Sequence, residues 1–412
     1  MRSFFKLALG AAAGAVMAVS AHAEAVKIAF IDPLSGPFAT TGTNGLAEWE
    51  YAVEELVNKT GLAGEGRTFE IAAFDNKISP KESLIQLQVA IDQGIRFIAQ
   101  GNSSGVANAL TDAINKHNRR NPDDRVLFIN YSAVDPALTN DKCNFWHFRF
   151  DANADIKMDA LSDVIKGNQD IKKIYLIGQD YSFGKAVAAA AVKYVGEKRP
   201  DVEIVGNELH PIGKVKDFTP YARKIIASGA DAIITGNWGA DMVGLGKSVI
   251  DAGFEGPIYT YYAAANGITK TFGADGKGTI RTIAEGVLNP PASDRAAAYV
   301  KGFKEKNPDF DITQARITNA AEMLAKAIAA SGSTDVVEIA KALEGMEHES
   351  IWGGKILMRA KDHQAIQDVH IFAHTDENIT FDLDNSGYGL LKESTVTMAA
   401  ADSPTTCEMK RP

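Results

Sequence analysis

The chain has little positive charge for its length. Among its 412 residues, 43 Lys and Arg stand against 52 Asp and Glu, so the formal net charge is −9 and the sequence pI is about 5.5. Nucleic-acid binding needs basic side chains that gather on one face and neutralise phosphates. An acidic chain without such a concentration of basic residues excludes nucleic acid as an expected partner.

Cysteine is scarce as well. Only Cys143 and Cys407 are present, and no Cys or His stands at metal-ligand spacing from either one. In an oxidising compartment, two cysteines far apart in sequence most simply form one disulfide. That bond would hold the C-terminal tail near residue 143. Two buried free thiols are the alternative.

Metal-binding patterns are missing from the sequence. The eight His residues include no H-E-x-x-H motif. His370 and His374 are four residues apart, but they flank a strand-like segment and would not share a helix face. Adjacent acids such as Asp123 and Asp124 lie in an Asn-Pro-Asp-Asp turn, where solvated loop charges are expected. The sequence therefore predicts no bound metal and no other cofactor.

Long hydrophobic runs are absent after the first 23 residues. The one such run, at residues 7–19, follows Arg2 and Lys6 and precedes a small-residue Ala-His-Ala site. It is shorter than the roughly 20 apolar residues that span a bilayer, and the three parts are typical of a secretory signal peptide. We expect residues 1–23 to be removed on export, which takes the formal charge from −9 to −11. The mature chain should be soluble outside the cytoplasm.

Short β-branched runs alternate with helical patterns from residue 25 onward, which indicates βαβ units. The expected strands lie at residues 26–31, 69–74, 96–100 and 126–130, and the helices at 44–59, 81–93 and 106–118. After residues 145–151 the alternation resumes, with strands at 172–178, 202–206, 232–235 and 257–262 and helices at 184–196, 219–228 and 241–252. The predicted fold class is α/β, with two Rossmann-like lobes that each contain a parallel sheet flanked by helices.

The last third of the chain does not form a third lobe of this kind. Residues 284–289 lead to helices at 295–306, 313–331 and 335–343, followed by strand-like segments at 355–359 and 367–373. Neither crossover between the lobes is a long linker, so a few residues can act as a hinge. Open parallel sheets bind ligands at the carboxyl ends of their strands, and we therefore expect a ligand in the cleft between the lobes.

Residues 101–105 read Gly-Asn-Ser-Ser-Gly between an expected strand and an expected helix. The pattern matches the G-x-S-x-G nucleophile elbow of hydrolases, with Ser103 as nucleophile and His363 as the one tempting base. The turn follows only the third strand, however, and no Gly-rich oxyanion segment precedes it. Exposed N–H groups and two hydroxyls at a helix N-terminus favour binding of an anion such as a carboxylate. Simple helix capping by Ser103 or Ser104 is the structural alternative.

Residues 239–248 resemble a phosphate-binding P-loop but depart from it at one position. The motif requires Gly where this chain has Asp241, whose charge opposes a phosphate. The segment is therefore interpreted as an amphipathic helix with Lys247 in solvent.

Three segments together resemble a known family. The first strand is followed by Asp-Pro-Leu-Ser-Gly-Pro-Phe-Ala at 32–39 with Gly42 three residues on, a Ser pair opens the third helix, and residues 131–139 read Tyr-Ser-Ala-Val-Asp-Pro-Ala-Leu-Thr. In this order they resemble the periplasmic binding proteins of the leucine/isoleucine/valine family, which are soluble receptors of ABC importers. The resemblance covers essentially the whole mature chain.

This resemblance implies the type I periplasmic binding fold, with a multi-strand hinge, and a location in the periplasm. It implies an inner-membrane ABC permease as partner, with no insertion of this chain into the membrane. The implied first lobe comprises residues 24–146 and about 287–350, and the second comprises 147–286 and about 351–412.

The resemblance also implies which residues touch the ligand. Its carboxylate would lie at the Ser pair and at residues 132–134, where Val134 replaces a common Thr and Ser132 would supply the donor. Phe38 would take the place of an aromatic found in some members at Thr41. Core packing is the alternative for each aromatic. The expected ligand-binding residues are Ser35, Phe38, Thr41, Asn102, Ser103, Ser104, Ser132, Ala133, Val134, Tyr181, Phe183, Trp238, Tyr261 and Tyr262.

One departure from the family concerns the ligand's ammonium group. Members usually meet it with an acidic residue after the last strand of the second lobe, yet residues 259–266 contain no carboxylate. A buried ammonium without a partner is costly. Either Asp180 or Glu285 serves instead, or the ligand has no ammonium.

The expected function is capture of a small carboxylate-bearing ligand by hinged lobe closure, without covalent chemistry. A branched-chain or other apolar amino acid is the first candidate. An aromatic carboxylate or a small amide is the alternative, and a secreted serine hydrolase that uses Ser103 is the remote one.

Overall fold

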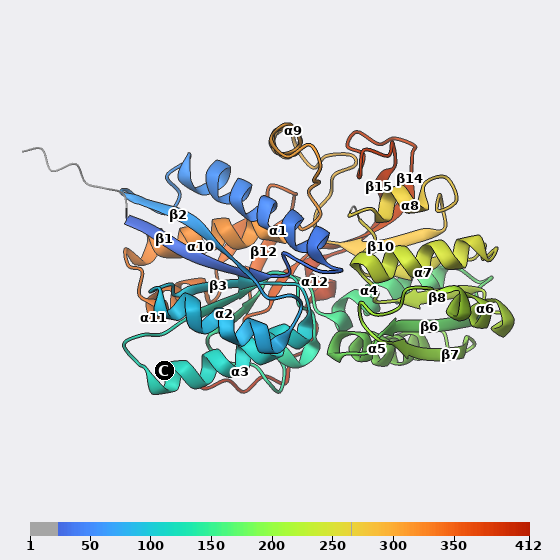
Figure 1. The fold of residues 1–412 in the computed structure, drawn as a ribbon, viewed down its shortest axis with the longest axis horizontal. Coiled ribbons are helices and arrows are strands. Elements are labelled where there is room, and N and C mark those ends of the chain that lie inside the picture. Colours follow the sequence, from blue (N-terminus) through green and yellow to red (C-terminus); the bar gives the residue numbers. More distant parts are fainter. Residues whose placement is uncertain (1–23, 265) are drawn as a thin grey trace, which may run out of the picture.

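The computed structural model describes residues 24–264 and 266–412. The expected signal peptide lies outside these residues. The chain forms two α/β lobes that lie side by side, the first on the left and the second on the right of Figure 1. Both lobes have the predicted architecture, so the α/β prediction with two Rossmann-like lobes is confirmed.

The first lobe contains a five-stranded parallel sheet in the order β2-β1-β3-β4-β5. Its strands are β1 (Glu24–Asp32), β2 (Arg67–Asp75), β3 (Phe97–Gln100), β4 (Leu127–Asn130) and β5 (His147–Arg149). The first four match the expected strands to within two residues. β5 lies in a segment that was expected only as a crossover.

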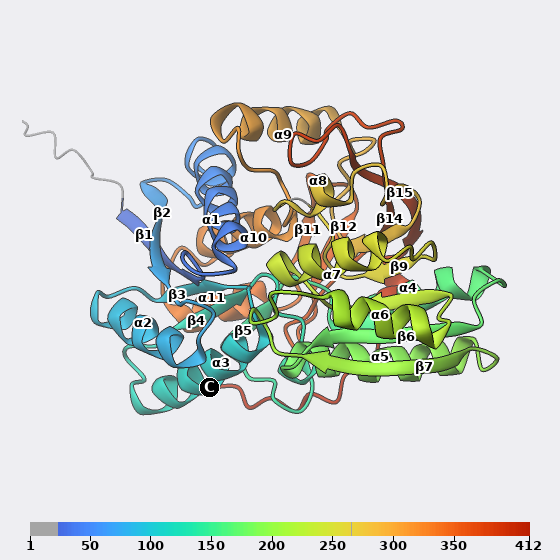
Figure 2. The same ribbon diagram turned by 45° about the vertical axis from the view of Figure 1, so that its right-hand side comes forward.

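Helices cover both faces of this sheet, with α1 and α10 on one side and α2 and α3 on the other (Figure 2). The helices of this lobe are α1 (Ala39–Ala52), its π-helical continuation η1 (Val53–Asn58), α2 (Pro80–Asp92), α3 (Ser104–Arg120), the 3₁₀ turn η2 (Pro136–Thr139), α9 (Asp294–Lys306), α10 (Arg316–Ser331) and α11 (Val336–Leu343). α10 begins three residues later than predicted, because the Glu48 carboxylate accepts the N–H groups of Thr313 and Gln314.

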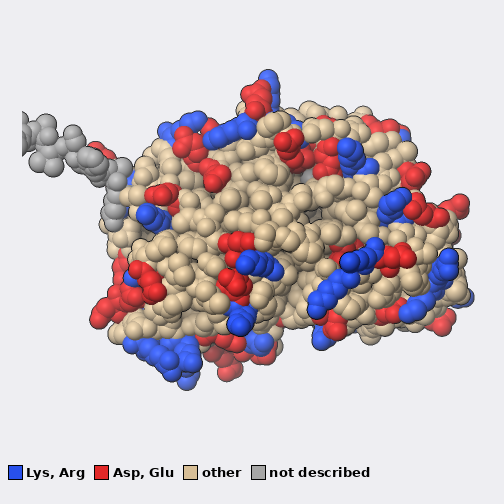
Figure 3. Space-filling view, in the orientation of Figure 1, with Lys and Arg blue, Asp and Glu red and all other residues tan. Residues whose placement is uncertain are grey.

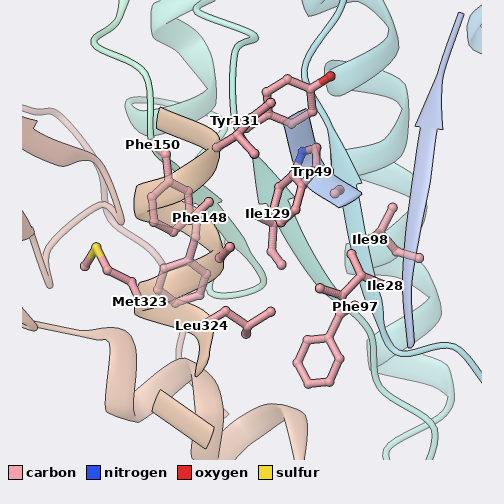
Figure 4. Close-up of a cluster of buried hydrophobic side chains, with 14 of the residues drawn as sticks. Ile28, Trp49, Phe97, Ile98, Ile129, Tyr131, Phe148, Phe150, Met323 and Leu324 are labelled. Carbon is pink, nitrogen blue, oxygen red and sulfur yellow. The ribbon is translucent and has the colours of Figure 1, made fainter. Parts of the chain in front are cut away.

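The core of the first lobe lies between the sheet and α10. Figure 4 shows Ile129 of the sheet near Leu324 of α10, and Phe148 beside Met323, whereas Ile98 points away from α10 to the other face of the sheet. These side chains are at most 1 % exposed. Burial of each large apolar side chain contributes about 1.5–3 kcal/mol to stability.

The second lobe contains a seven-stranded sheet in the order β15-β14-β10-β9-β8-β6-β7. Its strands are β6 (Lys173–Gln179), β7 (Glu203–His210), β8 (Ala232–Thr235), β9 (Ile258–Thr260), β10 (Ile280–Ala284), β14 (Val369–Thr375) and β15 (Gly389–Val396). The five strands from β7 to β10 are parallel, whereas β14 and β15 add an antiparallel edge. Neither β10 nor β15 was predicted.

The alternation of side chains along β6 gives this sheet a core on each face. Ile174 and Leu176 pack with α4 and α5, whereas Tyr175 and Ile177 pack with α6, α7 and α8. The helices are α4 (Ala154–Gly167), α5 (Ser182–Lys198), α6 (Thr219–Ser228), α7 (Gly239–Asp251), α8 (Ile268–Phe272) and α12 (Met398–Ala401). α7 contains the P-loop-like segment, and Lys247 on it is exposed beside Asp251. α4 was not predicted.

Three segments of chain cross between the lobes. The first follows β5, the second follows β10, and the third joins the small antiparallel sheet of β11 (Glu347–Glu349), β12 (Lys355–Met358) and β13 (Ala365–Gln367) to β14. Gln364 and Gln367 donate to the carbonyls of Asp151 and Phe150, at 2.8 and 2.9 Å, which ties the third crossover to the first. Between residues 351 and 365, every residue that is part of a hydrophobic core belongs to the core of the first lobe. The chain therefore passes to the second lobe near residue 366, later than the expected position of about 351.

The C-terminal tail returns from α12 to the first lobe and ends beside α3 (Figures 1 and 2). A disulfide joins Cys143 to Cys407, with 5.7 Å between their Cα atoms. Nearby, the Thr405 hydroxyl donates to the carbonyl of Thr139 at 2.6 Å. The tail therefore forms a further connection between the lobes.

Charges of both signs are interspersed on the face drawn in Figure 3, with a broad uncharged area between them. Within residues 24–264 and 266–412, no helix combines the length and apolar character that a membrane span requires. In the same part of the chain, no group of three His, Cys, Asp or Glu is placed to hold a metal ion.

Replacement of both cysteines by serine tests the contribution of the tail. We expect Cys143→Ser/Cys407→Ser to lower the free energy of unfolding by about 2–5 kcal/mol, because the open chain gains conformational freedom when unfolded. Urea unfolding with and without reductant measures this. Reductant should bring the wild type to the level of the variant and leave the variant unchanged. Equal stability of oxidised and reduced wild type would contradict the expectation.

Candidate functional site

A cavity lies between the two lobes, at the carboxyl ends of the parallel strands. The centre of a water-sized sphere can occupy about 80 Å³ of this cavity. By the same measure, one buried water needs roughly 10–15 Å³. The space fits a small organic molecule. All expected ligand-binding residues except Ser35 and Phe38 line it: Thr41, Asn102, Ser103, Ser104, Ser132, Ala133, Val134, Tyr181, Phe183, Trp238, Tyr261 and Tyr262.

Asp32, at the end of β1, supports the loop that opens α3. Its carboxylate accepts the N–H groups of Gly101 and Asn102, both at 3.0 Å, and the hydroxyl of Tyr131. Burial raises the pKa of Asp32 to about 7, although these hydrogen bonds oppose the rise. Asp32 thus fixes this loop by hydrogen bonds, and the N-terminus of α3 faces the cavity.

Ser103 is in a strained backbone conformation at this N-terminus. Its φ angle is +83°, a value that non-glycine residues rarely adopt and that is found at functional sites. Its side chain makes no capping hydrogen bond to α3, so helix capping by Ser103 is wrong. The hydroxyl remains available to a ligand.

Ser104 and Ser132 have structural contacts in addition to their place in the cavity wall. The Ser104 hydroxyl accepts the N–H of Asp135 at 3.2 Å and joins the two loops of the first lobe. Asn130 supports the second loop, since its side-chain oxygen accepts the N–H groups of Ser132 and Ala133 at 3.2 and 2.7 Å. The Ser132 hydroxyl accepts from Arg316 at 2.6 Å, which leaves its own proton free to donate.

The second lobe presents an aromatic wall. The indole N–H of Trp238 donates to the hydroxyl of Tyr181 at 2.8 Å, so the tyrosine proton is free to point elsewhere. Burial raises the pKa of Tyr181 well above its usual range and keeps that proton in place. Tyr181 is therefore a hydrogen-bond donor for a ligand. Tyr261, in contrast, donates to the carbonyl of Ala154 at 2.8 Å and offers only its ring.

Phe38 lies at the contact between the lobes instead of in the cavity wall. Its ring packs against Trp238 at an interplanar angle of 37°, with 4.3 Å between centroids. Gly213 and Gly239 of the second lobe, with φ angles of +64° and +55°, flank this ring, and a Cβ on either would approach it to 2.8 Å. Phe38 therefore fills a slot that only glycine leaves open. Ser35 is exposed and donates to Asp75 at 2.5 Å, away from the cavity.

A buried cluster of four charges lies behind the cavity and joins the lobes. Lys157 of α4 contacts Asp151 at 2.6 Å and Glu285 at 3.2 Å, while Arg316 of α10 contacts the same acids at 3.2 and 3.5 Å. Asp151 and Glu285 are on the first and second crossovers. Two acids and two cations balance each other, which is the condition for keeping charges in a core. The Tyr262 hydroxyl adds a hydrogen bond to Asp151 at 3.0 Å.

Burial raises the pKa of Asp151 to about 7, against the neighbouring Arg316. Burial acts in the same direction on Glu285, but Lys157, the hydrogen bond with Asp151 and Arg316 hold the pKa of Glu285 below its usual range. Glu285 is thus occupied by the cluster.

Neither acid proposed for a ligand ammonium lines the cavity. Asp180 is more than half exposed and pairs with Lys185 at 3.1 Å, and Glu285 belongs to the charge cluster. Among the described residues that line the cavity, none is Asp or Glu, and Arg316 is the one with a formal charge. The cavity therefore offers no carboxylate to an ammonium group.

Sequence reasoning missed the far end of the cavity. There the walls include Ile268, Thr282, Thr313, Arg316 and Leu390, all of which come after the strand expected at residues 257–262. The sequence contains one sign of the role of Arg316, because it is a charged residue at the start of an otherwise Ala-rich helix. Nothing in the sequence marks Leu390, because its place depends on the unpredicted strand β15.

The residues of the hydrolase hypothesis are not brought together. His363 stacks on Phe148 with 3.9 Å between ring centroids, and its Nε2 atom contacts Glu344 at 2.8 Å. It is buried in the first lobe and does not line the cavity that Ser103 faces. Ser103 and His363 therefore do not form the pair that this hypothesis requires.

The raised pKa of Asp32 predicts a pH dependence of stability. The folded protein retains a proton between about pH 4 and 7 that the unfolded chain releases, so this group makes the free energy of unfolding fall with rising pH in that window. The slope is at most about 1.4 kcal/mol per pH unit for one group. Asp32→Asn should flatten the dependence of the free energy of unfolding on pH. It should also lower that free energy at every pH, because the side-chain N–H of Asn would face the donors that the Asp32 carboxylate accepts.

Urea unfolding at several pH values gives this slope. Asp123→Asn, an exposed acid on a turn, is the control and should retain the wild-type slope. An Asp32→Asn curve as steep as that of the wild type would refute the assignment.

Comparisons with known proteins agree with the fold. The sequence profile of the family described as periplasmic binding protein matches residues 25–378. The Leu/Ile/Val-binding protein homolog 4 of Brucella abortus (strain 2308) is 31% identical over 404 residues, which cover 96% of this chain and 95% of that protein.

Two solved structures are similar over nearly the whole chain. The closed conformation of a leucine-, isoleucine-, valine-, threonine- and alanine-binding protein from Brucella ovis has a TM-score of 0.82 and 29% identity, covering 95% of this chain and 100% of that one. An ABC transporter solute-binding protein from Rhodopseudomonas palustris HaA2, in complex with p-hydroxybenzoic acid, has a TM-score of 0.77 and 20% identity, covering 91% and 98%. The chain belongs to the periplasmic binding protein family, with relatives among the Leu/Ile/Val-binding proteins.

Proposed function

We propose that this protein is the periplasmic receptor of an ABC importer, which captures a small organic carboxylate between its lobes and delivers it to an inner-membrane permease. The observation that carries the proposal is the distribution of polar groups in the cavity. Donors without a protein acceptor gather at one end, and no acidic side chain lines the walls among the described residues.

The carboxylate end of the ligand belongs at the N-terminus of α3. The first N–H groups of a helix and its dipole favour an anion there. The hydroxyl of Ser103 adds a donor from the first lobe, and that of Tyr181 adds one from the second. A carboxylate held by both lobes binds the closed form more tightly than the open form, so ligand shifts the equilibrium toward closure.

The body of the ligand lies among the rings of Phe183, Trp238, Tyr261 and Tyr262. The Tyr262 ring already faces Lys157 and Arg316, at 4.9 and 5.7 Å from its centroid, and a third cation there would be repelled. These features support an aromatic carboxylate without an ammonium group. The Rhodopseudomonas palustris protein solved with p-hydroxybenzoic acid shares the fold of this chain, which is in keeping with the proposal.

A branched-chain amino acid is the second candidate. It is favoured by the names of the Brucella relatives, one of which is 31% identical over 96% of this chain. With this ligand, backbone carbonyls would have to receive the ammonium group.

Closure requires the slot that receives Phe38. Gly213→Ala places a methyl group 2.8 Å from the Phe38 ring and should weaken ligand binding by about tenfold or more, because the closed form becomes less accessible. Gly229→Ala is the matched control. Its φ angle of +67° is almost the same, but its nearest neighbour is the Lys173 ammonium at 3.9 Å. Isothermal titration should show near-wild-type affinity for the control, and equal losses in both variants would show that the slot plays no part.

A thermal-shift screen of the mature protein tests the choice of ligand. We expect benzoate and 4-hydroxybenzoate to raise the melting temperature, whereas leucine, isoleucine and valine leave it unchanged. A ligand at 100 times its Kd adds about 2.7 kcal/mol of stability. Tyr181→Phe should weaken carboxylate binding by roughly 10- to 150-fold, since a hydrogen bond to a charged group contributes about 1.5–3 kcal/mol.

Tyr194→Phe on α5, a half-buried residue that does not line the cavity, is the control for loss of a hydroxyl, and its affinity should match the wild type. A shift with leucine, isoleucine or valine but not with the aromatic acids would favour the amino-acid candidate. No shift with either group would remove both candidates.

A further inference from the structure

A second cavity adjoins the far end of the ligand cavity. The centre of a water-sized sphere can occupy about 40 Å³ of this second cavity, which is enough space for a few methylene groups. Ala264, Ala284, Thr313, Arg316 and Leu390 line both cavities. The two spaces are therefore separated by no more than this shared set of residues.

The walls that belong to the second cavity alone are mainly apolar, and they include Leu288, Ile312, Phe372 and Leu383. Its polar side chains are occupied. Glu285 pairs with Lys157 and Arg316. The Asn289 amide donates to the carbonyls of Phe381 and Leu390 and accepts the N–H groups of Thr380 and Phe381, at 2.9–3.3 Å. No group there requires a polar guest.

The polar residues at the junction are occupied as well. Thr313 donates its hydroxyl to Glu48 at 2.8 Å. Arg316 is held by Ser132, Tyr131 and the two acids of the charge cluster. An apolar chain can therefore pass the junction without leaving a polar group newly unpaired.

Leu383 closes the second cavity from the loop between β14 and β15. This loop is fixed at its tip, since the Asp384 carboxylate accepts the N–H of Gly267 at 2.9 Å and the Asp384 N–H donates to Asp311 at 2.8 Å. The wall is thus anchored to segments of both lobes, and the space behind Leu390 is a cavity with fixed walls.

We infer that the second cavity is a tail subsite, which receives the apolar end of an elongated monocarboxylate whose carboxylate lies at Ser103 and Tyr181. This inference rests on the proposed function and specifies its ligand class. The ligand extends beyond the side chain of leucine, isoleucine or valine, past Arg316 and Leu390.

Straight-chain monocarboxylates from butanoate to decanoate, titrated calorimetrically into the mature protein, test the subsite. Affinity should rise about fourfold for each methylene that enters the second cavity, and then stop rising when the space is full. A flat dependence on chain length, with measurable binding of the short acids, would overturn the subsite and leave the proposed function standing.

Two substitutions at Leu383 should act in opposite directions, because this residue lines the second cavity and not the first. Leu383→Trp fills the space and should lower the ratio of octanoate to butanoate affinity by tenfold or more. Leu383→Ala enlarges it and should move the best chain length upward by one or two carbons. Leu343→Ala in α11 is the control for loss of core packing, and its affinity ratio should equal that of the wild type.

The ratio of affinities separates a subsite from a general loss of stability. A Leu383→Trp variant with an unchanged ratio would overturn the inference. If neither benzoate nor any straight-chain acid binds the wild type, the proposed function and the subsite are both wrong.

Discussion

The arrangement of the two lobes depends on the buried cluster of Asp151, Lys157, Glu285 and Arg316. Each lobe contributes one cation, and each of two crossovers contributes one acid, so no member can leave without stranding a charge in the core. The cluster also extends to the ligand cavity, because Arg316 contacts the Ser132 hydroxyl and Tyr262 contacts Asp151. The back wall of the cavity and the joint between the lobes are therefore one structure.

Different interactions position the residues at the front of the cavity. Asp32 and Asn130, at the ends of β1 and β4, occupy the N–H groups of the loops that follow β3 and β4. Because these inner donors are satisfied, the donors that this lobe presents to the cavity include the Ser103 and Ser132 hydroxyls and the N-terminus of α3. The second lobe supplies the Tyr181 hydroxyl and the slot for Phe38. Under the proposed function, each lobe alone is an incomplete binding site, and the ligand favours the closed form.

Much of this could be predicted from local sequence patterns. The βαβ alternation predicted the strands of both sheets up to β9 except β5, and most of the expected site residues lie on loops that directly follow those strands. Phe38 was assigned to the right loop but to the wrong contact, because the ring meets two glycines that are about 175 and 200 residues away. Arg316, Leu390 and the charge cluster could not be predicted, since their positions depend on chain crossings and on β10 and β15. The family resemblance located the cleft but not its far end.

The central claim is that a carboxylate bridges Ser103 and Tyr181 in a cavity without an acid for an ammonium group. A crystal structure of the mature protein grown with 4-hydroxybenzoate tests it most directly. The account predicts closed lobes, with the ligand's carboxylate oxygens within roughly 2.5–3.2 Å of both hydroxyls. A carboxylate bound at Arg316 instead, or a cavity that fills only when leucine is supplied, would contradict it.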